Sequence, residues 1–198
     1  MLKRIFDIVF SLFGLIILTP IFILVAVFIV LESRGGVFYR QLRIGQYQKG
    51  FRLLKFRTMH QRTTQGLSIT IGNNDARITK IGKVLRKYKL DELPQLWNVL
   101  IGEMSFVGPR PEVPRYVEMY NAEQLEVLSV KPGITDYASI KYRNENELLA
   151  KAENPEQFYI EEVMPSKLRL NMFYVKNQSF LLDIKLIVKT LVFIFVRS

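Results

Sequence analysis

The chain has 198 residues, enough for one domain with a hydrophobic core, and its 28 Lys and Arg against 18 Asp and Glu give a formal net charge of +10. Hydrophobic residues make up 49% of the chain, and a basic excess in so apolar a chain indicates a membrane surface or a polyanionic ligand held at one. There is no Cys and one His, His60, which excludes disulfides, thiolate nucleophiles, iron–sulfur clusters and multi-His zinc sites and leaves carboxylates, Lys, Arg and hydroxyls for chemistry.

The first predicted element is a membrane helix. Residues 8–31 form a run of 24 residues without a charge, which is long enough for a membrane helix. A signal peptide is the alternative, but its apolar region is usually shorter and ends at a small-residue cleavage site. This run is followed by Glu32, Ser33 and Arg34, so we expect it to remain as an anchor.

Thr19 and Pro20 lie at the middle of this run and predict a break. Pro20 has no N–H and its ring crowds the Ile16 carbonyl, so the helix should kink there, with the Thr19 hydroxyl able to bond a freed backbone group. Each arm of 12 residues is about 18 Å long, shorter than the ~30 Å hydrocarbon core. Basic residues flank both ends of the run, and the positive-inside rule places both flanks in the cytoplasm. We therefore favour a re-entrant helix over a kinked single-pass anchor. The flanking cations are Lys3, Arg4, Arg34, Arg40 and Arg43.

Short strands and a basic helix are predicted next. Residues 37–59 alternate apolar and basic side chains around Gly45 and Gly50, which predicts two strands or a hairpin. Residues 60–74 are rich in turn-forming residues and predict an exposed loop. In residues 77–88 apolar side chains recur at helical spacing among Lys and Arg, which predicts an amphipathic basic helix.

The second half of the chain predicts helices around one rigid loop. Acidic residues and a proline at 91–94 suit a first helical turn, and Gly102 ends that helix. Residues 104–114 contain three prolines and predict a shaped loop. Residues 115–127 return to helical periodicity. The mostly apolar residues 181–196 predict a helix that lies in an interface or packs on the protein.

The adjacent carboxylates Asp91 and Glu92 are the candidate catalytic groups. Alone, the pair fits a helix cap with a favourable dipole interaction. Cations accompany it, however, with Arg86 and Lys89 just before and Arg110 in the following loop. A carboxylate beside cations stays ionised and can attack phosphorus or bind a divalent metal. Without sulfur or several imidazoles, Mg²⁺ is the expected metal, and Mg²⁺ and guanidinium groups neutralise charge in phosphoryl transfer.

The ordered motifs resemble those of the monotopic phosphoglycosyl transferases, a group of bacterial sugar transferases. The matching stretches are KRIFD (3–7), KFRTM (55–59), LDELPQLWNV (90–99), MSFVGPRP (104–111), KPGIT (131–135), YVKN (174–177) and LDIK (182–185). The resemblance implies transfer of a phosphosugar from an NDP-sugar, expected to be a UDP-sugar, to polyprenyl (undecaprenyl) phosphate, with release of UMP and a covalent phosphosugar on an aspartate. It also implies a re-entrant helix broken at a Ser-Pro pair, a catalytic part on the cytoplasmic face of the bacterial inner membrane, and a place in the first membrane step of glycoconjugate or polysaccharide synthesis.

Carried over to this chain, the resemblance implies that Asp91 is the nucleophile and Mg²⁺ ligand and that Glu92 assists as a base or by positioning. The cations that match family residues near substrate phosphate or nucleotide are Lys55, Arg86, Arg110 and Arg143. Arg57 and Arg77 match more weakly, and the alternative for both is a surface cation facing lipid headgroups.

The chain departs from the family pattern at two places. Thr19-Pro20 stands where the family has Ser-Pro, a mild change because Thr keeps the hydroxyl. Residues 136–139 read DYAS, where the family usually continues with Gly, an apolar or aromatic residue, Ala and Gln. The sugar is therefore not predicted. Residues 144–167 contain no motif that we assign to chemistry and are candidates for a specificity loop or an oligomer contact.

The predicted fold is mixed α/β and mainly helical. A re-entrant membrane anchor is expected over residues 1–34, and a catalytic domain with short strands and amphipathic interfacial helices over residues 35–198. The expected partners are a UDP-sugar, polyprenyl phosphate and membrane lipids, with no nucleic acid, and a homodimer is left open. The alternative function is a non-catalytic, membrane-anchored basic module that binds nucleic acid or anionic lipid. That alternative explains the charge but gives no role to Asp91, Glu92 or Arg110, and the chain has no helix-turn-helix, RRM or zinc motif.

Overall fold

The computed structural model describes residues 1–60 and 77–195. The loop predicted over residues 60–74 lies, apart from its first residue, outside this described part. The described chain is mainly helical, with two small two-stranded sheets. This confirms the predicted class, mixed α/β with mostly helix.

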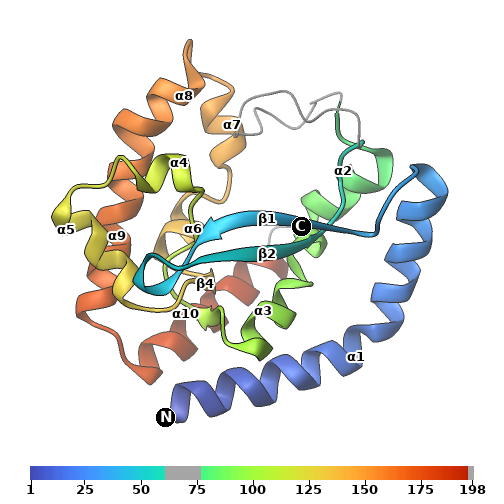
Figure 1. Ribbon diagram of the computed structural model, residues 1–198, viewed down its shortest axis with the longest axis horizontal. Helices are drawn as coiled ribbons and strands as arrows, with labels where there is room; N and C mark the ends of the chain where they lie inside the picture. The colour runs from blue at the N-terminus through green and yellow to red at the C-terminus, as the bar shows by residue number, and fades with distance from the viewer. Residues whose placement is uncertain (61–76, 196–198) are drawn as a thin grey trace.

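The N-terminal helix α1 spans Leu2–Glu32. The elements that follow are β1 (Phe38–Ile44), η1 (Gln46–Gln48), β2 (Gly50–Phe56), α2 (Lys80–Lys87), η2 (Leu90–Glu92), α3 (Gln95–Ile101), β3 (Ser105–Val107), α4 (Pro114–Val117), α5 (Ala122–Leu125), η3 (Glu126–Ser129), β4 (Gly133–Thr135), α6 (Tyr137–Lys141), α7 (Glu145–Leu149), α8 (Pro155–Phe158), η4 (Tyr159–Val163), α9 (Met164–Lys176) and α10 (Phe180–Phe195). Figure 1 shows the β1–β2 hairpin crossing the middle of the molecule, with α4, α5, α8 and α9 toward its left end and α2 and the second half of α1 toward its right end.

Helix α1 bends without ending at its proline. The helix is continuous through Pro20, and Figure 1 shows it changing direction as it wraps around one side of the molecule. The Thr19 hydroxyl donates to the Leu15 carbonyl at 2.8 Å, a contact to the preceding turn that bends helices, while Pro20 offers no donor to Ile16. The expected helix–break–helix is thus corrected to one bent helix, whose re-entrant course stays a prediction. In the described chain, α1 alone is long and apolar enough to cross a membrane.

The first turns of α1 are bonded to the C-terminal half of the chain. Lys3 forms an ion pair with Asp183 in α10, with Nζ and Oδ2 at 2.5 Å. Arg4 donates to two carbonyls in the last turn of α3, at 2.7 and 2.8 Å, where a cation is favoured. Buried Asp7 accepts from the Ser105 hydroxyl and from the next backbone N–H, each at 3.1 Å. The KRIFD stretch therefore docks the helix onto α3, β3 and α10.

The last turn of α1 is bonded to the same body of the protein. The Glu32 carboxylate accepts from the first two N–H groups of α2, at 2.5 and 2.8 Å, a favourable place for an anion. The Arg57 guanidinium donates to the carbonyls of Ser33 and Arg34, at 2.8 and 2.6 Å. Between these two attachments much of the helix is exposed, with Ile16 at 64%, although Val25 and Ile29 are buried against the protein.

The β1–β2 hairpin confirms the strands predicted in residues 37–59. It pairs antiparallel from Phe38↔Phe56 to Ile44↔Gly50. A second, parallel pair of β3 with β4 lies partly inside the predicted loop of residues 104–114, so that prediction was incomplete. Three-residue strands are too short to show an alternating pattern. Their approach depends on glycine, because a Cβ on Gly133 would lie 2.1 Å from the Gly108 nitrogen.

The predicted helices are confirmed with two changes. Helix α2 lies in residues 77–88 and is capped by the Thr79 hydroxyl, and α10 lies where residues 181–196 predicted a helix. The expected helix from residue 91 begins later, because 91–92 belong to the separate turn η2. The periodic residues 115–127 are divided into α4, α5 and η3, since Asn121 forms a capping box with Gln124 and starts a new helix.

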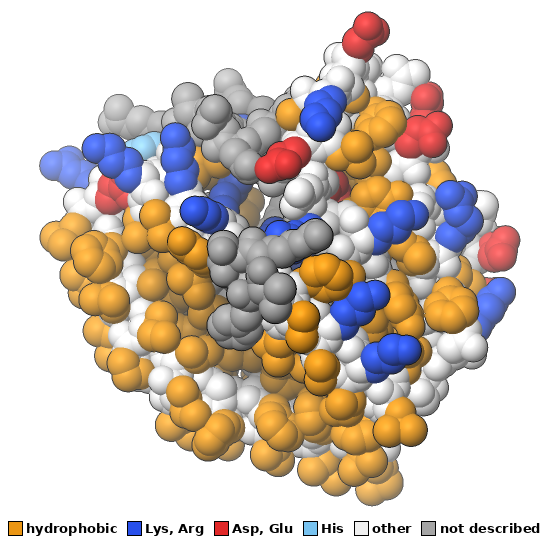
Figure 2. Space-filling view, turned by 180° about the vertical axis from the view of Figure 1, so that it is seen from behind, with side chains coloured by type: hydrophobic (Ala, Val, Ile, Leu, Met, Phe, Trp, Pro, Cys, Tyr) orange, Lys and Arg blue, Asp and Glu red, His pale blue; other side chains and the backbone are white. Residues whose placement is uncertain are grey.

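One side of the molecule is predominantly apolar. Figure 2 shows hydrophobic side chains gathered over its lower part, with Lys and Arg side chains higher up. Figure 1 places α3, α10 and the first part of α1 along this lower edge. Exposed apolar residues there include Trp97 and Ile101 of α3, at 50% and 51%, and Val188 of α10, at 53%. Large contiguous apolar surfaces of this kind mark interaction with a membrane or another protein.

Candidate active site

The two adjacent carboxylates lie in a tight turn between α2 and α3. Lys89, just before η2, has a left-handed backbone with φ of 58°, which reverses the chain between the basic helix and the carboxylates. Asp91 is 8% exposed, and the Glu92 side chain is 13% exposed. The turn thus buries most of both acids within the protein.

Glu92 is held by two cations. Its carboxylate accepts from Lys55 Nζ at 2.9 Å and from both terminal nitrogens of Arg110, one of them at 3.2 Å. Burial alone would raise the pKa of Glu92, but Arg110 and Lys55 outweigh burial and hold the pKa well below its usual range. A carboxylate that stays ionised is a weak base, so the geometry favours positioning over base catalysis for Glu92.

Asp91 has the opposite electrostatic character. Burial and the neighbouring Glu92 charge raise its pKa, against the opposing charges of Lys55, Arg86 and Lys89. Its Oδ1 atom is buried and has no hydrogen-bond partner among the described residues. A buried carboxylate oxygen without a partner is costly for the fold, and such cost is typical of functional groups. Asp91 is therefore the carboxylate available to a ligand.

The position of Arg86 depends on a glycine. Its Nε donates to the Thr58 hydroxyl at 2.9 Å, just after β2. The first turn of α2 approaches the same place so closely that a Cβ on Gly82 would lie 2.2 Å from the Thr58 carbonyl oxygen. This packing brings Arg86 close enough to influence the charge of Asp91.

Arg110 is fixed through its backbone as well as its side chain. Its N–H donates to Asp136 Oδ2 at 3.0 Å, and Asp136 Oδ1 caps α6 by accepting from the Ser139 N–H at 2.5 Å. Asp136 is fully buried. The residue at which this chain departs from the family pattern is thus a support for the arginine loop.

Three predicted cations lie elsewhere. Arg143 is exposed and donates to the Phe193 carbonyl of α10 at 3.3 Å, and no described contact joins it to Glu92. Arg57 is 7% exposed and bonded to the end of α1, which contradicts the alternative of a surface cation, while a place near substrate stays a prediction. The Arg77 carbonyl accepts from the His60 N–H at 3.0 Å, and a role for its side chain stays a prediction.

The structure adds a second buried ion pair that the sequence did not reveal. Arg43 and Glu112 meet at 3.1 Å, with side chains 16% and 15% exposed. The sequence places Arg43 on the basic flank of the membrane helix, and the alternating pattern of β1 does not indicate a partner for it. The one available signal was a charged residue, Glu112, immediately after the rigid Pro-Arg-Pro stretch.

The residues present fit a magnesium ion shared with substrate rather than one caged by protein. The described residues contain no group of three or more His, Cys, Asp or Glu that could hold a metal. Mg²⁺ usually binds through one or two carboxylates, waters and substrate phosphates. The unpartnered oxygen of Asp91 suits this arrangement, whereas Glu92 is engaged by its cations.

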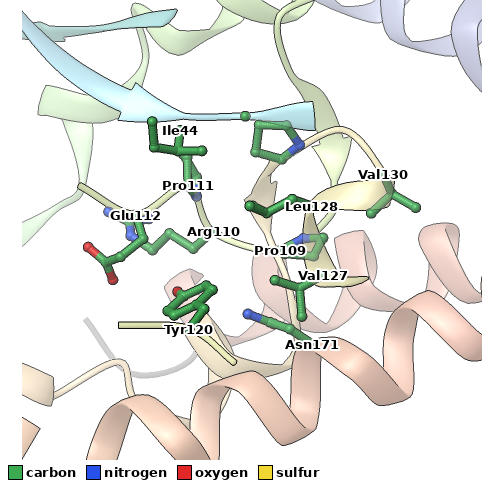
Figure 3. A pocket seen from close by; sticks show the side chains of 12 residues that line it. Ile44, Pro109, Arg110, Pro111, Glu112, Tyr120, Val127, Leu128, Val130 and Asn171 are labelled. Carbon is green, nitrogen blue, oxygen red and sulfur yellow. The ribbon is translucent and has the colours of Figure 1, made fainter. Parts of the chain in front are cut away.

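A small cavity lies beside the arginine loop (Figure 3). Its volume is about 20 Å³, and its lining includes Arg110, Glu112, Tyr120 and Asn171. That volume holds roughly one water molecule. The cavity is therefore too small for a nucleotide sugar, and the carboxylate turn is the better candidate site.

Comparison with known proteins supports the motif-based resemblance. The model of the bacterial sugar transferase family matches residues 1–197. The uncharacterized sugar transferase EpsL of Bacillus subtilis (strain 168) is 39% identical over 191 residues, which cover 96% of this chain and 85% of EpsL.

Two further relatives have names that state a reaction. The UDP-glucose:undecaprenyl-phosphate glucose-1-phosphate transferase of Klebsiella pneumoniae is 37% identical, covering 95% of this chain and 39% of the relative. The UDP-N-acetylgalactosamine-undecaprenyl-phosphate N-acetylgalactosaminephosphotransferase of Aeromonas hydrophila is 34% identical, covering 96% of this chain and 43% of the relative. The chain thus spans about two fifths of the length of these two proteins.

Proposed function

The chain belongs to the bacterial sugar transferase family, and we propose that it transfers a phosphosugar from a UDP-sugar to polyprenyl phosphate, with release of UMP. The observation that carries this proposal is Asp91, a buried carboxylate with an unpartnered oxygen beside the Glu92–Arg110–Lys55 cluster. Two relatives named for different UDP-sugars and for undecaprenyl phosphate support the substrate classes. Because their sugars differ, the proposal leaves the sugar open.

The reaction proceeds in two displacements at one phosphorus atom. An Asp91 oxygen attacks the phosphorus that bears the sugar, and the bond from this phosphorus to the bridging oxygen breaks, so that UMP leaves with that oxygen. An oxygen of polyprenyl phosphate then attacks the same phosphorus and Asp91 departs as a carboxylate. The products are UMP and a polyprenyl-diphosphate sugar, and the covalent aspartyl phosphosugar is the intermediate between them.

The surrounding cations make attack by an anion on an anion feasible. Lys55, Arg86 and Lys89 place positive charge around Asp91, and Arg110 adds its charge at the neighbouring Glu92. Charge neutralisation with positioning dominates phosphoryl-transfer catalysis. Glu92 holds Arg110 and Lys55 in place. Asp91 and the substrate diphosphate would hold Mg²⁺, which when bound supplies further charge neutralisation.

This function is tested by incubating membranes that contain the protein with individual UDP-sugars and undecaprenyl phosphate. Release of many UMP molecules per enzyme, which requires both substrates, is the expected result, and the UDP-sugar that supports it identifies the sugar. Affinity for DNA that falls steeply with salt, without UMP release, would instead support the basic binding module, which family membership does not favour.

The proposed site lies on the cytoplasmic face of the bacterial inner membrane, with α1 re-entrant. Both ends of α1 are bonded to one body of protein, through Lys3 and Arg4 at one end and Glu32 at the other. A helix that crossed the bilayer would separate these ends by about 30 Å of hydrocarbon. The bend of the helix (Figure 1) and its exposed apolar residues support entry and exit by the same face.

Cysteine labelling tests this topology, and the chain contains no native Cys. A single Cys at Met1 and, in a second variant, at Ser33 should each react with a membrane-permeant maleimide and be protected from an impermeant one added outside the cells. A variant with Cys at Glu123, an exposed position of the catalytic domain, is the reference for the cytoplasmic side. Labelling of Met1 and Ser33 from opposite sides would refute the re-entrant helix.

A further inference from the structure

Tyr159 is a buried polar side chain in a segment without a recognisable motif. It is 3% exposed, and its hydroxyl donates to Glu112. It begins η4, a π-helical turn between α8 and α9, and such turns interrupt the regular helical ladder and recur at functional sites. A Phe ring would fill the same apolar surroundings without needing a partner. Packing alone therefore does not explain the hydroxyl.

Two polar side chains contact this hydroxyl, Glu112 and Lys167. Lys167 of α9 lies 3.4 Å from it and donates to Glu145 of α7 at 2.9 Å. Burial and the Glu112 charge raise the pKa of Tyr159, so that the phenol keeps its proton and donates at neutral pH. The segment 144–167 thus reaches the loop after β3 through this hydroxyl.

Glu112 connects Tyr159 to the arginine loop. Its carboxylate accepts from Arg43 Nη1 at 3.1 Å, and the same nitrogen donates to the Pro111 carbonyl at 3.0 Å. The Glu112 carbonyl accepts from the Ile44 N–H at 2.9 Å. Burial would raise the pKa of Glu112, but nearby cations, Lys167 and Arg43 foremost, bring it below its usual value. The carboxylate is therefore an ionised acceptor that ties the loop to β1 and η4.

Arg110 lies between two fixed points of a stiff segment. Asp136 holds the Arg110 N–H on one side, and the Arg43–Glu112 contacts hold the next two residues on the other. Pro109 and Pro111 fix their own φ angles, so the loop has little freedom to absorb a shift. Movement of Glu112 would be passed to the guanidinium that holds Glu92.

We propose that Tyr159 is a positioning residue for phosphosugar transfer, which acts through Glu112 and the loop of residues 109–112 to place Arg110 against Glu92 and the substrate phosphate. This inference rests on the proposed function. It assigns to the segment 144–167 a part in the reaction that does not require contact with substrate.

The test compares Tyr159→Phe with Tyr116→Phe. Tyr116 is a matched control, because it is 2% exposed, its ring lies 5.0 Å from that of Tyr159, and its hydroxyl is directed to Glu156 rather than to Glu112. Tyr159→Phe should lower kcat for UMP release by about 10- to 100-fold, the scale of a small misplacement of catalytic groups, and Tyr116→Phe should leave kcat within about twofold. In an Arg110→Lys background, Tyr159→Phe should cause no further loss, because its effect passes through Arg110.

Hydrogen exchange gives a readout that does not depend on activity. In Tyr159→Phe the amide protons of Arg110 and Val113 should exchange at least about tenfold faster than in the wild type, and in Tyr116→Phe their exchange rates should not change.

Equal exchange and equal turnover in the two variants would overturn the inference, as would a full additional loss of kcat in the Arg110→Lys background. If Tyr159→Phe does not fold, Glu112→Gln, which keeps the volume and removes the charge, is subject to the same criteria. Absence of UMP release from the wild type with every UDP-sugar would overturn the proposed function instead, and exchange would still decide whether Tyr159 holds the loop.

Discussion

Asp91→Asn is expected to lower kcat for UMP release by about 10³-fold or more, the scale seen when a catalytic nucleophile is removed. The amide has nearly the shape of the carboxylate but cannot attack phosphorus, and it cannot contribute an anionic ligand to Mg²⁺. Because both displacements pass through this oxygen, the exchange of labelled UMP into UDP-sugar in the absence of polyprenyl phosphate should disappear as well. Retention of full turnover by Asp91→Asn would eliminate Asp91 as the nucleophile.

The same substitution should stabilise the fold. Burial raises the pKa of Asp91 above 3.8, so ionisation is easier in the unfolded chain than in the folded protein. The resulting cost to folding appears as the pH rises through the unfolded value of about 3.8 and is complete above the folded value. Asn removes this cost, so Tm at pH 7 should rise by a few degrees, while the difference from wild type should vanish near pH 3.

The control for this comparison is Glu123→Gln, at an exposed position away from the site. It removes one negative charge without removing a buried one, so both turnover and Tm should match the wild type. A fall in Tm of Asp91→Asn at pH 7 would mean that the carboxylate supports the fold, contrary to the geometry of its unpartnered oxygen.

Local signals in the sequence predicted most of the elements, because each rests on neighbouring residues. The apolar run predicted α1, the periodicity of residues 77–88 predicted α2, and Gly102, with φ of 93°, ended α3 as expected. The parallel pairing of β3 with β4 was missed because three residues carry no period. Its enabling feature, the contact of Gly108 with Gly133, joins positions that no local pattern relates.

The site was predicted in part for the same reason. Composition and neighbouring cations indicated the chemistry proposed for Asp91, and the ordered motifs indicated its proposed role. The pairing of Glu92 with Arg110, however, is a contact between distant segments, and spacing does not specify such contacts. Arg57 shows this limit of sequence analysis most clearly. The residues around it do not indicate that its guanidinium donates to two carbonyls at the end of α1.

Glu92→Ala is expected to lower the free energy of unfolding by about 3–5 kcal/mol, the cost of leaving buried charges without their partner. The loss of the carboxylate leaves both Arg110 and Lys55 largely buried with no counter-charge from Glu92. Turnover should also fall sharply, since the two cations no longer have a fixed position beside Asp91. Denaturant titration of the detergent-solubilised protein measures the stability, and the slope of the transition should be unchanged.

The pH dependence and a double variant separate this explanation from a loss of packing. Opposing the effect of burial, Arg110 and Lys55 hold the folded pKa of Glu92 well below 4.5, so its stabilisation is complete above about pH 4.5 and is lost as the pH falls through the folded value. The stability difference between wild type and Glu92→Ala should therefore shrink on acidification. Adding Lys55→Met to Glu92→Ala removes one unpartnered cation and should restore at least about 1 kcal/mol of the free energy of unfolding. If Glu92→Ala destabilised the fold only by leaving a cavity, neither this recovery nor the dependence on acid would be observed.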